Sequence, residues 1–92
     1  MRHAFLVTAY RDFPTLSSLI EQLLSVSDSR VYINIDGRSK KLIDQIKVYL
    51  NNLNSPRIDL QTQTVRWGSY EHFDVYMQMA KKAIVDNCEY FH

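Results

Sequence analysis

The chain has 92 residues, of which 46 % are hydrophobic, and it carries a formal net charge of +1 at pH 7. This length accommodates one small domain, and the nearly balanced charge gives no electrostatic argument for binding to nucleic acid or to an anionic membrane. Cys88 is the only cysteine, which excludes a disulfide framework and a cysteine zinc site. We expect it to be a small core or near-surface residue rather than a nucleophile.

The first third of the chain predicts a strand followed by a helix. Residues 3–10 form a continuous apolar run, which is typical of a strand buried on both faces. Asp12 can cap the following helix, and Pro14 suits its first turn. The apolar stripe predicted for that helix consists of Leu16, Leu19, Ile20, Leu23 and Leu24.

The next segment repeats the same order after a polar turn over residues 25–30. Residues 31–36 alternate with a period of two, which predicts a second strand. Gly37 permits a sharp turn, and Ser39 can cap a second helix. The stripe of that helix consists of Leu42, Ile43, Ile46, Tyr49, Leu50 and Leu53, and Pro56 ends it.

The last third predicts a short strand over residues 57–61, which residues 62–67 extend or follow as a separate extended segment, and a helix capped by Ser69. The helical stripe consists of Phe73, Tyr76, Met77, Ala80, Ala83 and Ile84. Residues 90–92 look like the opening of a fourth strand. The alternation predicts an α/β fold, a Rossmann-like parallel sheet with flanking helices. Because the chain stops as a strand opens, we expect the N-terminal part of a longer protein. The alternative is a short edge strand that closes a small domain.

Three residues that can hold a nucleotide stand at the ends of the predicted strands: Tyr10, Asp36 and Trp67. Ligands of open α/β sheets bind outside the carboxyl ends of parallel strands. Asp36 can accept a hydrogen bond from a base N–H or a sugar hydroxyl, although a turn or capping aspartate before Gly37 is the alternative. Tyr10 and Trp67 can stack on a base, and the alternative for both is ordinary packing.

Several motifs are absent from the sequence. With two glycines, the chain contains neither GxGxxG nor a GxxxxGKS/T phosphate loop. It has no Asp-x-Asp pair to hold a metal beside a diphosphate and no pattern of nucleophile and base. His3, His72 and His92 show no ligand spacing, so we interpret them as structural or surface residues.

Three motifs together resemble the core-2/I-branching β-1,6-N-acetylglucosaminyltransferase family, glycosyltransferase family 14, which includes the xylosyltransferases of proteoglycan synthesis. They are HAFLVTAY at residues 3–10, VYINID at residues 31–36 and VRWGSY at residues 65–70. The closing YFH is similar to the start of the family's next strand. The resemblance spans essentially the whole chain. Asn34 departs from it, because many members have histidine there, and we expect this to affect packing more than chemistry.

The resemblance implies a GT-A type fold in which residues 1–92 are the N-terminal UDP-sugar-binding part of a longer glycosyltransferase, inactive alone. The donor would be UDP-N-acetylglucosamine or a related UDP-sugar. Ala9 and Tyr10 would lie against the uridine, Asp36 would bind the uracil or ribose, and Trp67 would lie near the base. Transfer in the family inverts the anomeric centre without a metal, so no cofactor or metal is expected. The basic residues and the general base lie downstream in the family, so no catalytic residue is expected within this chain.

The implied partners are the UDP-sugar and a glycan acceptor that meets the C-terminal part, with no nucleic acid. A sheet edge left open at the fourth strand also invites self-association. No apolar run approaches the roughly 18–20 residues of a transmembrane helix, and no signal peptide is present. We therefore expect a cytoplasmic or membrane-peripheral bacterial protein. The alternative function is a small α/β interaction module without a small-molecule site.

Overall fold

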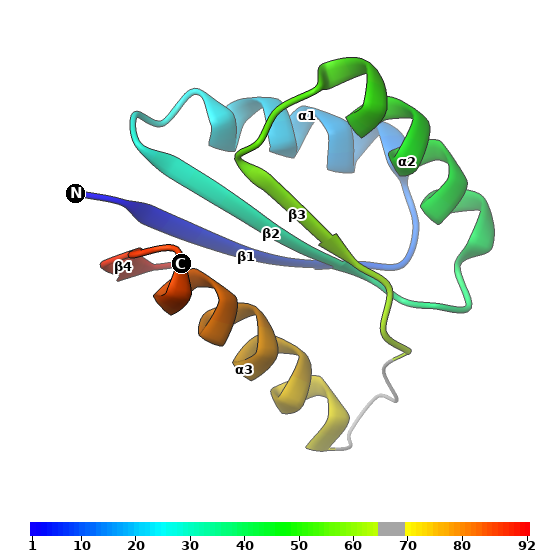
Figure 1. Cartoon of the computed structure of the whole chain (residues 1–92). Helices are drawn as coiled ribbons and strands as arrows, with labels where there is room; N and C mark the ends of the chain where they lie inside the picture. The colour runs from blue at the N-terminus through cyan, green and yellow to red at the C-terminus, as the bar shows by residue number, and fades with distance from the viewer. Residues whose placement is uncertain (65–69) are drawn as a thin grey trace.

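The computed structural model describes residues 1–64 and 70–92, in which strands and helices alternate (Figure 1). In chain order the elements are β1 (His3–Ala9), α1 (Phe13–Leu24), β2 (Ser29–Ile35), α2 (Lys40–Leu53), β3 (Ile58–Gln61), α3 (Tyr70–Val85) and β4 (Tyr90–Phe91). The predicted alternation is therefore confirmed. The bounds of the first two strands differ from the prediction: β1 ends at Ala9 rather than at Tyr10, and β2 runs from Ser29 to Ile35 rather than from Val31 to Asp36.

The described strands form one parallel sheet in the order β3-β2-β1-β4. β1 and β2 pair along their full length, from His3 opposite Ser29 to Ala9 opposite Ile35. β4 lies on the other side of β1 and pairs with its first two residues. The direction of winding therefore reverses at β1, as in doubly wound folds. This confirms the α/β class and the Rossmann-like arrangement.

Helices cover both faces of the sheet, with α1 and α2 on one face and α3 on the other (Figure 1). β2 is the most enclosed strand: Val31, Ile33 and Ile35 pack toward α1 and α2, and Tyr32 is buried against α3. This alternation is the one that the sequence predicts. β1 is less enclosed than its apolar run indicates, because Ala4 is buried and its other residues are half-buried.

The two helix starts on the first face differ. The Asp12 carboxylate accepts hydrogen bonds from the Thr15 amide at 3.3 Å and the Thr15 hydroxyl at 2.8 Å, so the predicted cap of α1 is confirmed. Ser39 occupies the corresponding position of α2 but makes no capping hydrogen bond. Its hydroxyl instead donates to the carbonyl oxygen of Tyr10, at 2.7 Å. Ser39 therefore stands at the predicted N-cap position, but the prediction that its side chain caps α2 is wrong.

The stripe predicted for the third helix is wrong except at Ala83, which is buried as expected. Val75, Met79 and Ala83 are the residues of α3 that are buried against the sheet. Phe73 and Ile84, which the sequence analysis assigned to the core, are 64 % and 63 % exposed. Because α3 carries apolar residues on two sides, a hydrophobic period alone does not decide which side faces the sheet.

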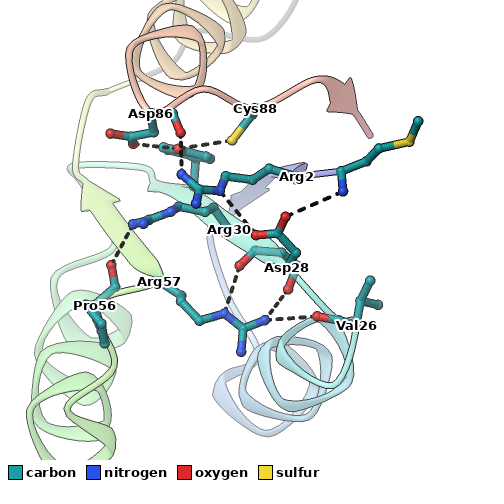
Figure 2. A network of polar contacts seen from close by, with 11 residues as sticks. Arg2, Val26, Asp28, Arg30, Pro56, Arg57, Asp86 and Cys88 are labelled. Atoms are coloured by element: carbon teal, nitrogen blue, oxygen red, sulfur yellow. Dashed lines mark hydrogen bonds and ion pairs between the residues drawn. The ribbon is translucent and has the colours of Figure 1, made fainter.

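Arg57 stabilises the sheet at the amino ends of its strands, the region shown in Figure 2. Its guanidinium donates to the carbonyl oxygen of Ser29 at 2.8 Å and to those of Leu24 and Val26 at 3.0 Å, and it also contacts the Ser29 hydroxyl. Leu24 is the last residue of α1, so the side chain satisfies a helix-terminal carbonyl group. One arginine thus links β3 to the turn between α1 and β2.

Arg2 makes a second link at this edge (Figure 2). Its Nε donates to Asp28 at 3.2 Å, and its Nη1 donates to the backbone oxygen of Asp86 at 2.6 Å. The hydrogen bond from Arg2 lowers the pKa of the Asp28 carboxyl. The start of β1 is thereby joined both to the turn before β2 and to the end of α3.

Tyr32 connects the buried strand to that same end of α3. Its hydroxyl donates to the Asp86 carboxylate at 2.6 Å and lies 3.7 Å from the Cys88 sulfur. Burial and then the hydrogen bond to Asp86 raise the pKa of the Tyr32 hydroxyl. A buried polar group is costly unless it is paired, so this contact favours one position of the α3–β4 turn. Cys88 is buried, consistent with the expected core role.

Tyr32→Phe is expected to lower the free energy of unfolding by about 1–3 kcal/mol, because it removes a hydrogen bond to a carboxylate. Urea denaturation followed by circular dichroism measures this difference. Tyr49→Phe is the matched control, since that hydroxyl donates to Glu21 at the surface, at 3.2 Å. Equal losses in the two variants would contradict the role given to Tyr32.

Asp12 is expected to make stability depend on acid pH. Its hydrogen bonds from the Thr15 side chain and backbone hold the pKa of its carboxyl below the ordinary 3.8. The stabilising contribution is therefore complete above about pH 3.8 and is lost as the pH falls through the lowered value. Asp12→Asn keeps a capping oxygen without a titrating charge. Its unfolding free energy, measured by urea titration from pH 5 to pH 2, should decline less than that of the parent. Parallel declines would contradict this.

Candidate functional site

Tyr10 and Asp36, two of the predicted nucleotide-binding residues, lie next to each other at the carboxyl edge of the sheet. They directly follow the paired residues Ala9 and Ile35. The backbone N–H of Asp36 donates to the carbonyl oxygen of Ala9 at 3.0 Å. Tyr10 is 47 % exposed. The structure therefore brings Ala9, Tyr10 and Asp36 together at the edge where α/β sheets bind ligands.

The Asp36 carboxylate is held by Arg38, two residues further along the chain. Oδ1 accepts from the Arg38 backbone amide at 3.0 Å and from its Nε at 3.1 Å, while Oδ2 accepts from Nη2 at 2.8 Å. The Asp36 side chain is 13 % exposed and that of Arg38 is 62 % exposed. Asp36 thus has the turn-forming role that the sequence analysis gave as the alternative. The same contacts fix its carboxylate at the sheet edge.

β3 is the short strand of the prediction, and residues 62–64 do not extend it. β3 ends at Gln61, and the buried Asn34 side chain takes over as partner beyond it. Asn34 Nδ2 donates to the Gln63 carbonyl at 3.1 Å, and Asn34 Oδ1 accepts from the Gln63 amide at 3.0 Å and from Gln61 Nε2 at 3.2 Å. Beyond the end of β3, hydrogen bonds of the Asn34 side chain therefore replace the backbone hydrogen bonds between neighbouring strands. Trp67, the third predicted site residue, and the Ser69 cap lie outside the described residues.

Gly37 explains why this segment can pass so close to the turn after β2. A Cβ atom at Gly37 would lie 2.7 Å from the Thr64 hydroxyl and 2.8 Å from the Thr62 carbonyl oxygen. Gly37 lies in the turn that the sequence predicts, and the structure also requires a glycine there because two backbones approach closely. The chain after β3 is therefore packed against the Asp36 turn.

A pocket of about 590 Å³ opens between the loops that follow β1 and β2. Its lining includes four cationic residues, Arg11, Arg38, Lys40 and Lys41, and one carboxylate, Asp12. The guanidinium of Arg11 lies over the Tyr10 ring, 5.1 Å from its centroid. The sequence analysis gave these cations no role. The sequence does place basic residues shortly after two of the predicted strand ends, and this placement could have indicated a cationic site.

The start of α2 adds to the positive character of this pocket. Ser39, Lys40 and Lys41 line it, and the Ser39 hydroxyl points to Tyr10 rather than to the amides of the first helical turn. Those amides and the helix dipole favour negative charge at a helix N-terminus. The pocket therefore suits an anionic group that lies beside an aromatic ring.

The sequence predicts neither a metal site nor a transmembrane helix, and the described residues can be compared with both expectations. Among residues 1–64 and 70–92, no group of three or more His, Cys, Asp or Glu side chains is arranged to hold a metal ion. His3 and His92 nevertheless lie in contact, with Nδ1 and Nε2 3.1 Å apart, although their spacing in sequence gave no sign of it. No helix in the described part of the chain has the length and apolar character needed to cross a membrane.

Asn34→Leu is expected to lower the free energy of unfolding by about 1–3 kcal/mol, because it leaves the backbone groups of Gln63 unpaired beside the core. The Gln63 amide should also lose protection from hydrogen exchange, measured by NMR. Gln61→Leu removes one bond to Asn34 and one from Lys82 but leaves the Gln63 backbone paired, so it is the matched control. Retained protection of Gln63 in Asn34→Leu would contradict the role given to Asn34.

Comparison with known proteins identifies no family for this chain. No protein-family model, no curated protein and no solved structure matches it. The fold class therefore rests on the observed topology, and the candidate site rests on its geometry. The glycosyltransferase resemblance stays a prediction from the sequence motifs.

Proposed function

We propose that this chain binds the nucleotide part of a UDP-sugar at the carboxyl edge of β1 and β2, as part of a metal-independent, inverting glycosyltransferase. One observation carries the proposal: Tyr10 and Asp36 lie next to each other at the ends of two paired parallel strands. That is the position at which open α/β sheets bind nucleotides. The three sequence motifs that resemble glycosyltransferase family 14 give the ligand class. UDP-N-acetylglucosamine or a related sugar nucleotide is the proposed donor.

In this arrangement Asp36 accepts a hydrogen bond from the uracil N–H or from a ribose hydroxyl. The three bonds from Arg38 orient the carboxylate before the ligand arrives. The exposed Arg38 side chain can exchange one of its bonds for the ligand at little cost, since such surface pairs contribute little stability. Tyr10 supplies a half-exposed ring against which a base or ribose packs.

The charge of the adjoining pocket supports an anionic ligand. Arg11, Lys40 and Lys41 surround a space large enough for phosphate groups. Arg11 lies over the Tyr10 ring, so a group that packs on Tyr10 meets a cation nearby. Cationic side chains are the usual means of balancing a diphosphate when no metal does so. Catalysis itself and the glycan acceptor are proposed to depend on residues outside this chain.

Two observations favour the second candidate, an interaction module without a small-molecule site. The Asp36 carboxylate is already paired within its own turn, so the turn needs no ligand for its stability. The exposed apolar residues of α3 are also a feature of protein-binding surfaces. This candidate predicts that uridine nucleotides leave the protein unchanged.

Titration of the isotope-labelled protein with UDP, followed by backbone amide shifts, tests the proposed site. We expect saturable shifts at Tyr10 and Asp36 and at the Trp67 indole. Asp36→Ala should weaken binding at least tenfold, because it removes a hydrogen bond to a charged acceptor. Asp44→Ala, an exposed carboxylate of α2 outside the pocket lining, is the matched control and should bind like the parent.

Two further measurements sharpen this test. Arg38→Ala removes two of the three bonds that orient the Asp36 carboxylate and one cation of the pocket lining, so it should weaken UDP binding, but less than Asp36→Ala does if Asp36 contacts the ligand directly. ADP should bind more weakly than UDP, because the proposed contact reads the base as well as the phosphates. Absence of saturable shifts at millimolar UDP would contradict the proposal and favour the interaction module.

A further inference from the structure

The outer surface of α3 carries a second apolar stripe, separate from the one that faces the sheet. Phe73, Met77 and Ile84 are 64 %, 42 % and 63 % exposed, and Ala80 lies between them in sequence. Their spacing of four, three and four residues is that of the seam positions in a coiled coil. The inner stripe, with Val75 and Met79, is already buried against the sheet.

Nothing in the described part of the chain covers this outer stripe. α3 lies by itself on its face of the sheet, with both other helices on the opposite face (Figure 1). The Tyr76 hydroxyl contacts the Thr8 hydroxyl at 3.0 Å, which helps to hold α3 in this orientation. The exposed stripe covers on the order of 300–400 Å², a size at which apolar patches on soluble proteins are often functional.

The stripe is complementary to itself when a second α3 runs antiparallel to the first. A twofold axis near Gln78 and Met79 places Phe73 against the partner's Ile84 and Met77 against the partner's Ala80. A twofold interface uses the same surface on both subunits, so each contact occurs twice. An unrelated partner protein would not require this symmetry in the sequence of α3.

The charges beside the stripe fit the same arrangement. Asp74 and Lys81 each follow a seam residue, so they flank the stripe on one side of the helix. Both are exposed, and neither forms an ion pair within the part of the chain that the structure describes. In the antiparallel pair, Asp74 lies opposite the partner's Lys81, and Lys81 lies opposite the partner's Asp74. The two ion pairs are equivalent by symmetry.

We propose that a second copy of this chain docks on the outer face of α3, and that the two α3 helices form an antiparallel, twofold-symmetric seam. Two such stripes with their flanking residues bury on the order of 1,000 Å² in total, the lower end of the range for specific interfaces. The dimer is therefore expected to be reversible, with a dissociation constant in the micromolar range. Its surface is separate from the nucleotide pocket and from the sheet edges.

Sedimentation equilibrium with charge-reversal variants tests this arrangement. D74K and K81D should each raise the dissociation constant on the order of tenfold, because each brings like charges together twice. An equimolar mixture of D74K and K81D should dimerise as the parent does, since every pair then joins opposite charges. The double variant D74K/K81D should also recover dimerisation. D44K, a reversal on the exposed surface of α2, is the matched control and should leave the equilibrium unchanged.

Phe73→Gln and Ile84→Gln should each abolish the dimer at 100 µM protein while circular dichroism stays that of a folded chain. A parent protein that is monomeric at that concentration would overturn the proposal. A dimer that is unaffected by all of these substitutions would also overturn it and would place the interface elsewhere, such as along an edge of the sheet. Failure of the mixture to recover dimerisation would contradict the antiparallel pairing.

Discussion

The pairing of two buried polar side chains on β2 is the constraint on which the rest of this fold depends. Tyr32 and Asn34 both point to the α3 side of a strand that is almost completely buried. Polar groups in such a place must find hydrogen-bond partners. Tyr32 donates a hydrogen bond to Asp86 at the end of α3, and Asn34 donates one to Gln63 just beyond β3. Since the two partners lie on different connections, one strand fixes the chain both after the last helix and after the third strand.

The two edges of the sheet have different roles because different groups gather there. At the amino edge, arginine side chains donate mainly to backbone carbonyl groups, so their hydrogen bonds hold the turns in place. At the carboxyl edge, by contrast, several cations line a pocket, and the Asp36 carboxylate is paired with Arg38, two residues further along the chain. Because the turns at the amino edge are held by these hydrogen bonds, the loops at the carboxyl edge are free to vary in shape and charge. This division is common in parallel sheets, where ligand binding is confined to one end of the strands.

Much of the fold could be predicted from the sequence because its local signals agree. The apolar run of β1, the alternation in β2, the Asp12 cap and the stripe of α2 each predict the element that is observed. Predictions failed where one signal allowed two answers. α3 is apolar on two sides, and the Ser39 hydroxyl can donate forward or back. The turn at Gly37 was predicted, but its close approach to Thr62 and Thr64 was not, because that contact is remote in sequence. Of the candidate site, Ala9, Tyr10 and Asp36 were placed correctly at the sheet edge, but the Arg38 pair and the basic pocket depend on loop geometry.

The burial of Cys88 gives the molecule an internal reporter of its own local opening. Cys88 is 8 % exposed, and its sulfur lies beside Tyr32, in the turn that joins α3 to β4. A thiol reagent can reach it only when that turn separates from β2, so the rate of modification measures how often the separation occurs. If the rate matches that of global unfolding, the last helix and strand belong to the same cooperative unit as the central sheet. A faster rate would mean that the α3–β4 end of the protein opens while the rest stays folded.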